Sequence, residues 1–122
     1  MKIAITSSGN TLKSEVDPRF GRAAYFLIGD LETDDFSAIE NSNVNAAGGA
    51  GINSAKVVID AGAEAVLTGN CGPNAERALR AAGVKLYTGA KGTVAEAIEL
   101  FRNGSIKEAD SPNVQSHFGS GI

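Results

Sequence analysis

The period of the hydrophobic residues changes half-way along this 122-residue chain, and this change constrains the fold more than any other feature. In the first half, apolar residues alternate or form short runs, which is typical of strands at Lys2–Thr6, Ala24–Leu31 and Phe36–Asn41. In the second half they recur every three or four residues, as in amphipathic helices. A chain of this length is expected to form one domain around one core.

The first half predicts a hairpin. The tetrapeptide ETDD separates the second and third predicted strands, and its aspartates favour a turn because their carboxylates bond the local backbone. These two strands should therefore pair in antiparallel fashion.

The second half predicts three helices with recognisable ends. Pro73 suits the first position of the second helix, and Gly83 suits its exit. Thr93 and Glu96 form a capping box for the third helix, which should close at Gly104. The predicted inner faces comprise Ile52, Ala55, Val58 and Ile59, then Ala75, Ala78, Leu79 and Ala82, then Val94, Ala97, Ile98 and Phe101.

Short apolar runs at Glu64–Gly69 and Lys85–Gly89 lie between these helices and lead directly into the next one, as parallel strands do. The expected order is β-β-β-α-β-α-β-α, a single α/β domain with a five-stranded mixed sheet and flanking helices. We expect this domain to span residues 1–107. Residues 108–122, rich in Ser, Gly, Asp and Asn, should form a flexible tail.

Charge and composition argue against several classes of function. Eleven basic and fourteen acidic side chains give a net charge of -3 without a basic tract, so nucleic acid is not an expected partner. One cysteine excludes an intramolecular disulfide. No run approaches the ~20 apolar residues that cross a bilayer. We therefore expect a cytoplasmic protein that does not bind membranes.

Three glycine-rich segments precede the predicted helices: Gly48–Gly51, Gly69–Pro73 and Gly89–Thr93. In open α/β sheets such helix starts gather beyond the carboxyl ends of the strands, where free N–H groups and the helix dipole favour an anion. Lys91 adds a charge to the third segment. We expect all three to converge on one edge, although glycines before helices are also ordinary turn residues.

The loop at Asp17–Phe26 is a second candidate for ligand binding. Arg19 and Arg22 offer planar donor groups to an anion, and Gly21 permits a sharp bend. The alternative is that Phe20 fastens the loop to the core while both arginines are merely solvated.

Cys71 and His117 are the sole cysteine and histidine of the chain. A position at a helix start lowers the pKa of a thiol, so Cys71 could supply a thiolate ligand. The alternative is a small buried residue in a turn. One residue of each kind cannot build a complete zinc or iron-sulfur cage, and His117 lies in the predicted tail.

Several blocks together resemble the dinitrogenase iron-molybdenum cofactor biosynthesis family, in its NifX-type form that also occurs as the C-terminal domain of NifB. They are MKIAITSSGN, SEVDPRFGRAAYFLIGDLET, GGAGINSA, LTGNCGPNAERALRAAGVKLY and GTVAEAIELFRNG, and they span roughly residues 1–107. The resemblance implies a ribonuclease-H-like arrangement. It also implies a non-enzymatic protein that binds an iron-sulfur or iron-molybdenum-type cluster and carries it between cluster-assembly proteins.

The resemblance focuses the candidate site on the edge described above. Carriers of this family commonly have histidine directly before Phe-Gly, where this chain has Arg19, whose guanidinium cannot coordinate iron. Any protein ligand to metal would then be Cys71, His117 or a carboxylate. The expected cofactor-binding residues are Arg19, Phe20, Gly21, Arg22, Gly48, Gly49, Gly51, Gly69, Asn70, Gly72 and Lys91, and the expected metal ligands are Cys71 and His117.

Two other functions remain open from the sequence. The same edge could bind a phosphate-bearing small molecule or a partner's carboxylate without metal. The fold analogy also allows a nuclease, which would require clustered carboxylates and magnesium. The sequence leaves the cargo, the partner and the oligomeric state open.

Overall fold

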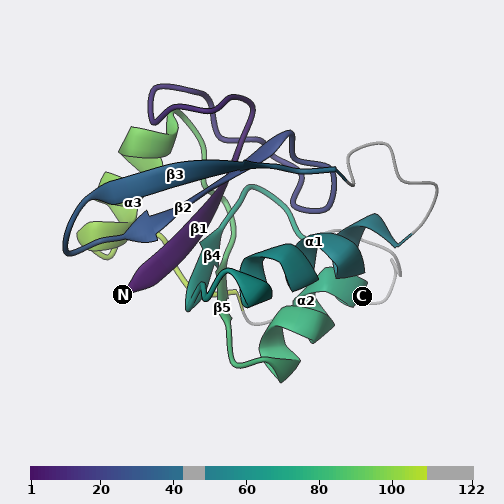
Figure 1. Ribbon diagram of the computed structural model, residues 1–122. Helices are drawn as coiled ribbons and strands as arrows, with labels where there is room; N and C mark the ends of the chain where they lie inside the picture. The colour runs from purple at the N-terminus through teal and green to yellow at the C-terminus, as the bar shows by residue number, and fades with distance from the viewer. Residues whose placement is uncertain (43–48, 110–122) are drawn as a thin grey trace.

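A computed structural model describes residues 1–42 and 49–109, and it places five strands and three helices in the predicted order (Figure 1). The elements are β1 (Lys2–Ser7), β2 (Tyr25–Asp30), β3 (Asp35–Glu40), α1 (Ala50–Asp60), β4 (Ala65–Leu67), α2 (Pro73–Ala81), β5 (Lys85–Tyr87) and α3 (Val94–Arg102).

The five strands form one mixed sheet in the order β3-β2-β1-β4-β5. The hairpin of β2 and β3 is antiparallel, as is the pairing of β1 with β2. β4 lies parallel to both β1 and β5. The predicted α/β class and the mixed five-stranded sheet are confirmed, while the ribonuclease-H-like comparison stays a prediction.

Helices cover both faces of the sheet. α1 and α2 pack side by side on one face, over a core that includes Phe26, Val58 and Leu79. α3 lies on the opposite face, over a second core that includes Ile5 and Ile98. The start of α3 is thereby separated by the sheet from the starts of α1 and α2.

The inner face of α1 differs from the prediction. Ile52 is 50% exposed, whereas Ala50 and Ser54 are buried with Ala55 and Val58. The Ser54 hydroxyl donates a hydrogen bond to the Gly21 carbonyl at 2.9 Å, which gives a polar side chain a reason to face inward. The expectation that Ile52 lines the core is therefore wrong.

The other predicted boundaries differ only at their ends. β4 and β5 stop at Leu67 and Tyr87, because the chain leaves the sheet there to reach the next helix start. Ala82 is exposed at the C-cap of α2, so it does not belong to the inner face. Pro73 opens α2, and the capping box of α3 is complete.

The chain continues along β5 after α3. Glu108 pairs with Tyr87, and the Ala109 N–H donates to the Leu86 carbonyl at 2.7 Å. The rest of the predicted tail, including His117, lies outside the described residues, so the boundary at residue 107 stays a prediction. Within residues 1–42 and 49–109, no helix has the length and apolar character to cross a membrane.

Candidate functional site

Two loops pair through their backbones at the carboxyl ends of β1 and β4. The Asn70 N–H donates to the Pro18 carbonyl at 2.7 Å, and the Phe20 N–H donates to the Asn70 carbonyl at 3.1 Å. Gly69 permits this approach, because a Cβ there would lie 2.8 Å from the Pro18 Cα. Gly69 therefore allows the two loops to pack closely, and its predicted contact with a ligand stays a prediction.

The start of α1 packs against this loop pair. A Cβ on Gly21 would lie 3.0 Å from the Gly51 nitrogen, and a Cβ on Gly51 would lie 3.3 Å from the Ala75 Cβ. Side chains at these positions would separate loop 17–24, α1 and α2. The glycines thus allow three backbone segments that are distant in the sequence to meet at one place.

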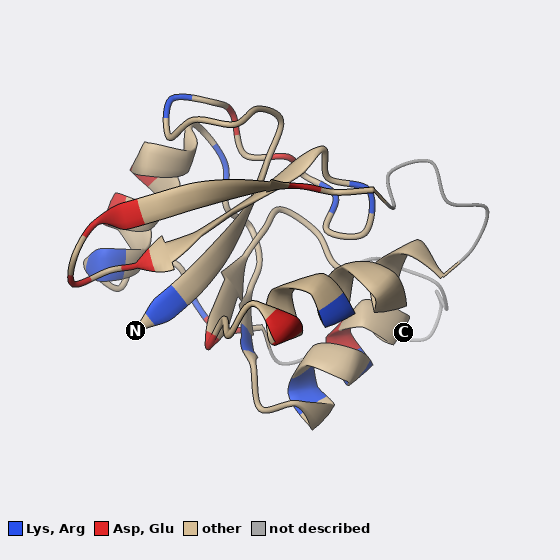
Figure 2. Ribbon diagram, viewed as in Figure 1, with Lys and Arg blue, Asp and Glu red and all other residues tan. Residues whose placement is uncertain are grey.

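An open cavity of about 380 Å³ lies where the three segments meet. Its lining includes the backbone of Gly49, Gly51 and Gly72 together with Arg19 and Arg22. Figure 2 shows basic positions on the loop between β1 and β2, beside the start of α1. The structure therefore brings together most of the predicted site, including Phe20, Gly21 and Asn70.

The starts of α1 and α2 both open into this cavity without a side-chain cap. Their N-cap residues are Gly49, which is left-handed with φ of 72°, and Gly72, which is extended. Neither helix receives a side-chain hydrogen bond at its N-cap. Uncapped helix starts present N–H donors and the positive end of the helix dipole, so the cavity favours an anion.

The third glycine-rich segment begins at the same edge, where the Gly89 N–H donates to the Gly69 carbonyl at 3.0 Å, but it leads into α3 on the opposite face of the sheet. The N–H groups of Val94 and Ala95 donate to the carbonyls of Ser14 and Leu12 at 2.8 and 2.9 Å. The Thr93 hydroxyl accepts from the Glu96 N–H at 3.1 Å. The donors at the start of α3 are therefore already bonded within the protein.

Lys91 comes just before α3 in the sequence and lies on the same face of the sheet as that helix. It lines a separate shallow hollow of about 690 Å³ with Ala95, Glu96 and Leu100. Lys91 does not line the anion cavity, because α3 begins at the same edge of the sheet as α1 and α2 but on the opposite face; its predicted role in anion binding stays a prediction.

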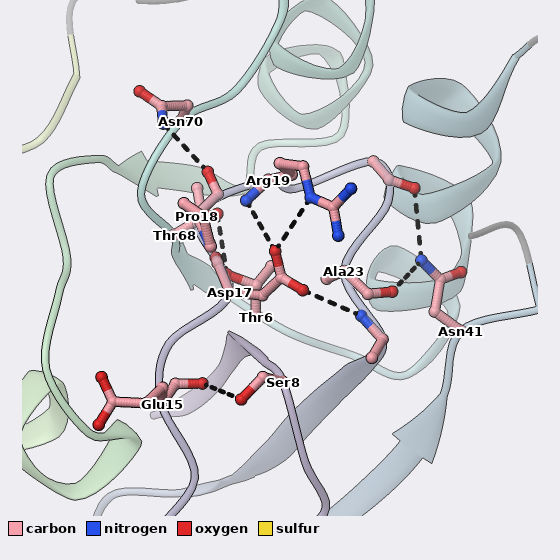
Figure 3. A network of polar contacts seen from close by, with 12 residues as sticks. Thr6, Ser8, Glu15, Asp17, Pro18, Arg19, Ala23, Asn41, Thr68 and Asn70 are labelled. Carbon is pink, nitrogen blue, oxygen red and sulfur yellow. Dashed lines mark hydrogen bonds and ion pairs between the residues drawn. The ribbon is translucent and has the colours of Figure 1, made fainter. Parts of the chain in front are cut away.

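A buried carboxylate shapes loop 17–24, and the sequence analysis did not identify its role (Figure 3). Asp17 is 5% exposed. Its Oδ1 accepts from the Arg19 N–H at 3.0 Å and from Arg19 Nε at 3.4 Å, and its Oδ2 accepts from the Ala24 N–H at 3.3 Å. Asp17 thus fixes both the loop and the side chain of Arg19.

Other buried polar groups fasten the same loop. The Thr6 hydroxyl donates to the Asp17 carbonyl at 2.7 Å and lies 2.9 Å from the Thr68 hydroxyl. Asn41 Nδ2 donates to the carbonyls of Ala23 and Gly21, at 2.7 and 3.3 Å. The sequence does not reveal these hydrogen bonds, because a polar residue at the end of a strand is equally common where its side chain faces solvent.

Phe20 fastens loop 17–24 to the core, as the structural alternative predicted. It is 1% exposed, and its ring centroid lies 5.6 Å from that of Phe26. The Arg19 side chain, by contrast, is 61% exposed at the rim of the cavity. The loop is therefore both anchored and able to present a charge.

Cys71 is buried in the core, between Asn70 and Gly72, two residues that line the cavity. It is 1% exposed, and its thiol contacts the Gly72 carbonyl with Sγ 3.6 Å from the oxygen. Burial, with a smaller contribution from Glu76, raises the pKa of Cys71 to about 12. The expected lowering of this pKa is wrong, because loss of solvent outweighs the effect of the helix start.

Two predicted residues, Gly48 and His117, lie outside the described part of the chain. Among the residues that the structure describes, no three His, Cys, Asp or Glu side chains are grouped so as to hold a metal ion. The roles of Cys71 and His117 as metal ligands stay predictions.

Comparison with known sequences and structures places the chain in a family. The sequence model described as dinitrogenase iron-molybdenum cofactor matches residues 1–104. The chain belongs to this family. An uncharacterized Methanocaldococcus jannaschii protein is 31% identical over 111 residues, which is 88% of this chain and 91% of the relative.

Two solved structures in particular resemble this fold. The orange protein from Desulfovibrio gigas, solved in its apo form, is 42% identical with a TM-score of 0.89, over 92% of this chain and 95% of that chain. A Thermotoga protein assigned to NifB is 40% identical with a TM-score of 0.78, over 88% of this chain and 91% of that chain. The similarities extend over nearly all of both chains.

Proposed function

We propose that this chain is a non-enzymatic accessory protein that binds an anionic iron-sulfur or iron-molybdenum-type cluster in the cavity and delivers it to cluster-assembly proteins. The family, and the similarity to a protein assigned to NifB, support a role connected with cofactor assembly. The observation that carries the proposal is that two uncapped helix starts open into the same cavity as Arg19 and Arg22.

The donors around the cavity suit a cluster that brings its own sulfide ligands. Backbone N–H groups at Gly51 and Gly72 would donate to sulfide, and the guanidinium groups would balance its negative charge. Arginine has no lone pair to give to iron. The protein would thus hold the cluster by charge and hydrogen bonds.

Coordination by Cys71 is the competing way to hold the cluster. It would require the thiol to be uncovered and deprotonated, against the burial that raises its pKa to about 12. A cluster that is not coordinated by the protein can leave the cavity without the breaking of a bond between protein and metal. Such release is suited to transfer between proteins.

A second function, the binding of a phosphate-bearing small molecule, is favoured by one specific observation. The features that line the cavity, namely helix starts, glycine backbone and arginine, are those that bind phosphate, and the one cysteine is buried in the core. The two functions differ in whether sulfide-bearing clusters are preferred to phosphate.

Anaerobic titration separates these functions. We would measure binding of a synthetic thiolate-capped iron-sulfur cluster, and competition by inorganic phosphate, for wild type, Arg19→Ala and Arg22→Ala. Loss of one charge-assisted contact should weaken cluster binding about tenfold or more. Lys85→Ala, which removes an exposed charge from β5, is the control and should bind as wild type does. Preference for phosphate over the cluster would favour the second function.

A further inference from the structure

The Arg19 guanidinium is held along one edge. Its Nε lies 3.4 Å from Asp17 Oδ1, and the backbone N–H of the same arginine donates to that oxygen at 3.0 Å. The Asp17 carboxylate is buried, and its other oxygen is bonded to the Ala24 N–H. Asp17 is therefore a fixed partner, because moving it would break the contacts that shape the loop.

The opposite edge of the same guanidinium is available to a ligand. Figure 3 shows its two terminal nitrogens directed away from the Asp17 carboxylate. Within residues 1–42 and 49–109, Asp17 is the one acceptor that the Arg19 side chain contacts. Arg19 also lines the cavity, with 61% of its side chain exposed. Four of the five guanidinium N–H groups thus remain for an anion.

We propose that Arg19 divides its guanidinium between two acceptors, with Asp17 as a positioning residue that grips Nε so that the terminal nitrogens face the bound anion. This inference rests on the proposed anion-binding function and names the residue that orients its charge. Lysine cannot replace arginine in such an arrangement, because its single ammonium would sit on Asp17. A positive charge alone at position 19 is therefore insufficient for tight anion binding.

The test compares Arg19→Lys with Arg19→Ala, each in the wild-type and the Asp17→Asn backgrounds. The probes are the synthetic thiolate-capped iron-sulfur cluster and inorganic phosphate, titrated anaerobically. Arg19→Lys should lose about tenfold in affinity and come within twofold of Arg19→Ala. In the Asp17→Asn background the lysine is released, so Arg19→Lys should bind at least about fivefold more tightly than Arg19→Ala.

Arg102→Lys is the matched control. Arg102 also pairs with an aspartate, Asp34, but it belongs to α3 on the other face of the sheet. Its replacement should change binding less than twofold. A comparable loss in Arg102→Lys would show a general effect of the substitution and overturn the inference.

A measurement without ligand keeps the inference testable if Asp17→Asn fails to fold. The Arg19 Nε–H of the wild-type protein should exchange with solvent markedly more slowly than that of Arg77, an exposed arginine of α2. Equal exchange rates would contradict the claim that Asp17 holds the Arg19 Nε–H in solution. Wild-type binding matched by Arg19→Lys would overturn this inference alone, whereas a wild type that binds neither probe would overturn the proposed function as well.

Discussion

A single methyl group at Gly69 should separate the two loops that form the cavity. A Cβ at this position would lie 2.8 Å from the Pro18 Cα, whereas ordinary contacts begin near 3.4 Å. The loops must therefore move apart by about 0.6 Å. The hydrogen bond from the Phe20 N–H to the Asn70 carbonyl, now 3.1 Å, would lengthen to about 3.7 Å, which is no longer a hydrogen bond.

The cost of Gly69→Ala follows from these two effects. Overpacking of this kind costs about 1–3 kcal/mol, and one lost hydrogen bond costs about 1 kcal/mol. We expect the free energy of unfolding to fall by about 2–4 kcal/mol. In a domain of this size that corresponds to a decrease in Tm of roughly 10 °C, measurable by circular dichroism or calorimetry.

Gly72→Ala provides the matched control for this prediction. Gly72 has an ordinary φ of -77°, and a Cβ there would meet nothing within 4 Å. Its Tm should change by no more than a few degrees, although the methyl group would intrude into the cavity and weaken anion binding. Equal Tm values for Gly69→Ala and wild type would refute the argument that close approach of the loops shapes this site.

Four further predictions concern Cys71, Thr93 and Asn41. Cys71 should react slowly with alkylating reagents at pH 8 until the protein unfolds, and rapid labelling of the native protein would contradict its burial. Because the folded pKa of Cys71 is raised from 9.0 to about 12, the unfolded thiol loses its proton first, and stability should fall from about pH 9 to 12 by up to ~1.4 kcal/mol per pH unit; Cys71→Ala should show a shallower fall. Thr93→Ala removes the capping box of α3 and should cost about 1 kcal/mol in urea unfolding, with anion affinity unchanged, since α3 begins on the other face. Asn41→Ala leaves the Ala23 carbonyl without its donor and should cost about 1–3 kcal/mol, and a neutral effect would show that the buried network does not hold the loop.

The element order was predictable because its signals are local. The apolar run of β2, the capping box at Thr93 and Pro73 at the start of α2 are each visible within a few consecutive residues of the sequence. Local signals do not place Arg19 and Arg22 beside the glycines of two helix starts, because β1 already ends at Ser7; the family resemblance suggested that these residues share an edge, and they line one cavity.

The features that the sequence did not predict depend on contacts between distant segments of the chain. The role of Asp17 arises from a loop that folds back on Arg19 and Ala24, and the burial of Cys71 arises from packing of loop 69–72 against the core. The face on which α3 lies is set by how the chain crosses the sheet after β5. No pattern within the sequence of α3 distinguishes that face from the one covered by α1 and α2.

The most direct test of the central claim is retention of cluster through anaerobic gel filtration by wild type, Cys71→Ser and the double variant Arg19→Ala/Arg22→Ala. Our account predicts that wild type and Cys71→Ser elute with equal iron, whereas the double variant elutes with little. Loss of iron from Cys71→Ser, with retention by the arginine variant, would contradict a site that holds its cargo by charge and backbone donors.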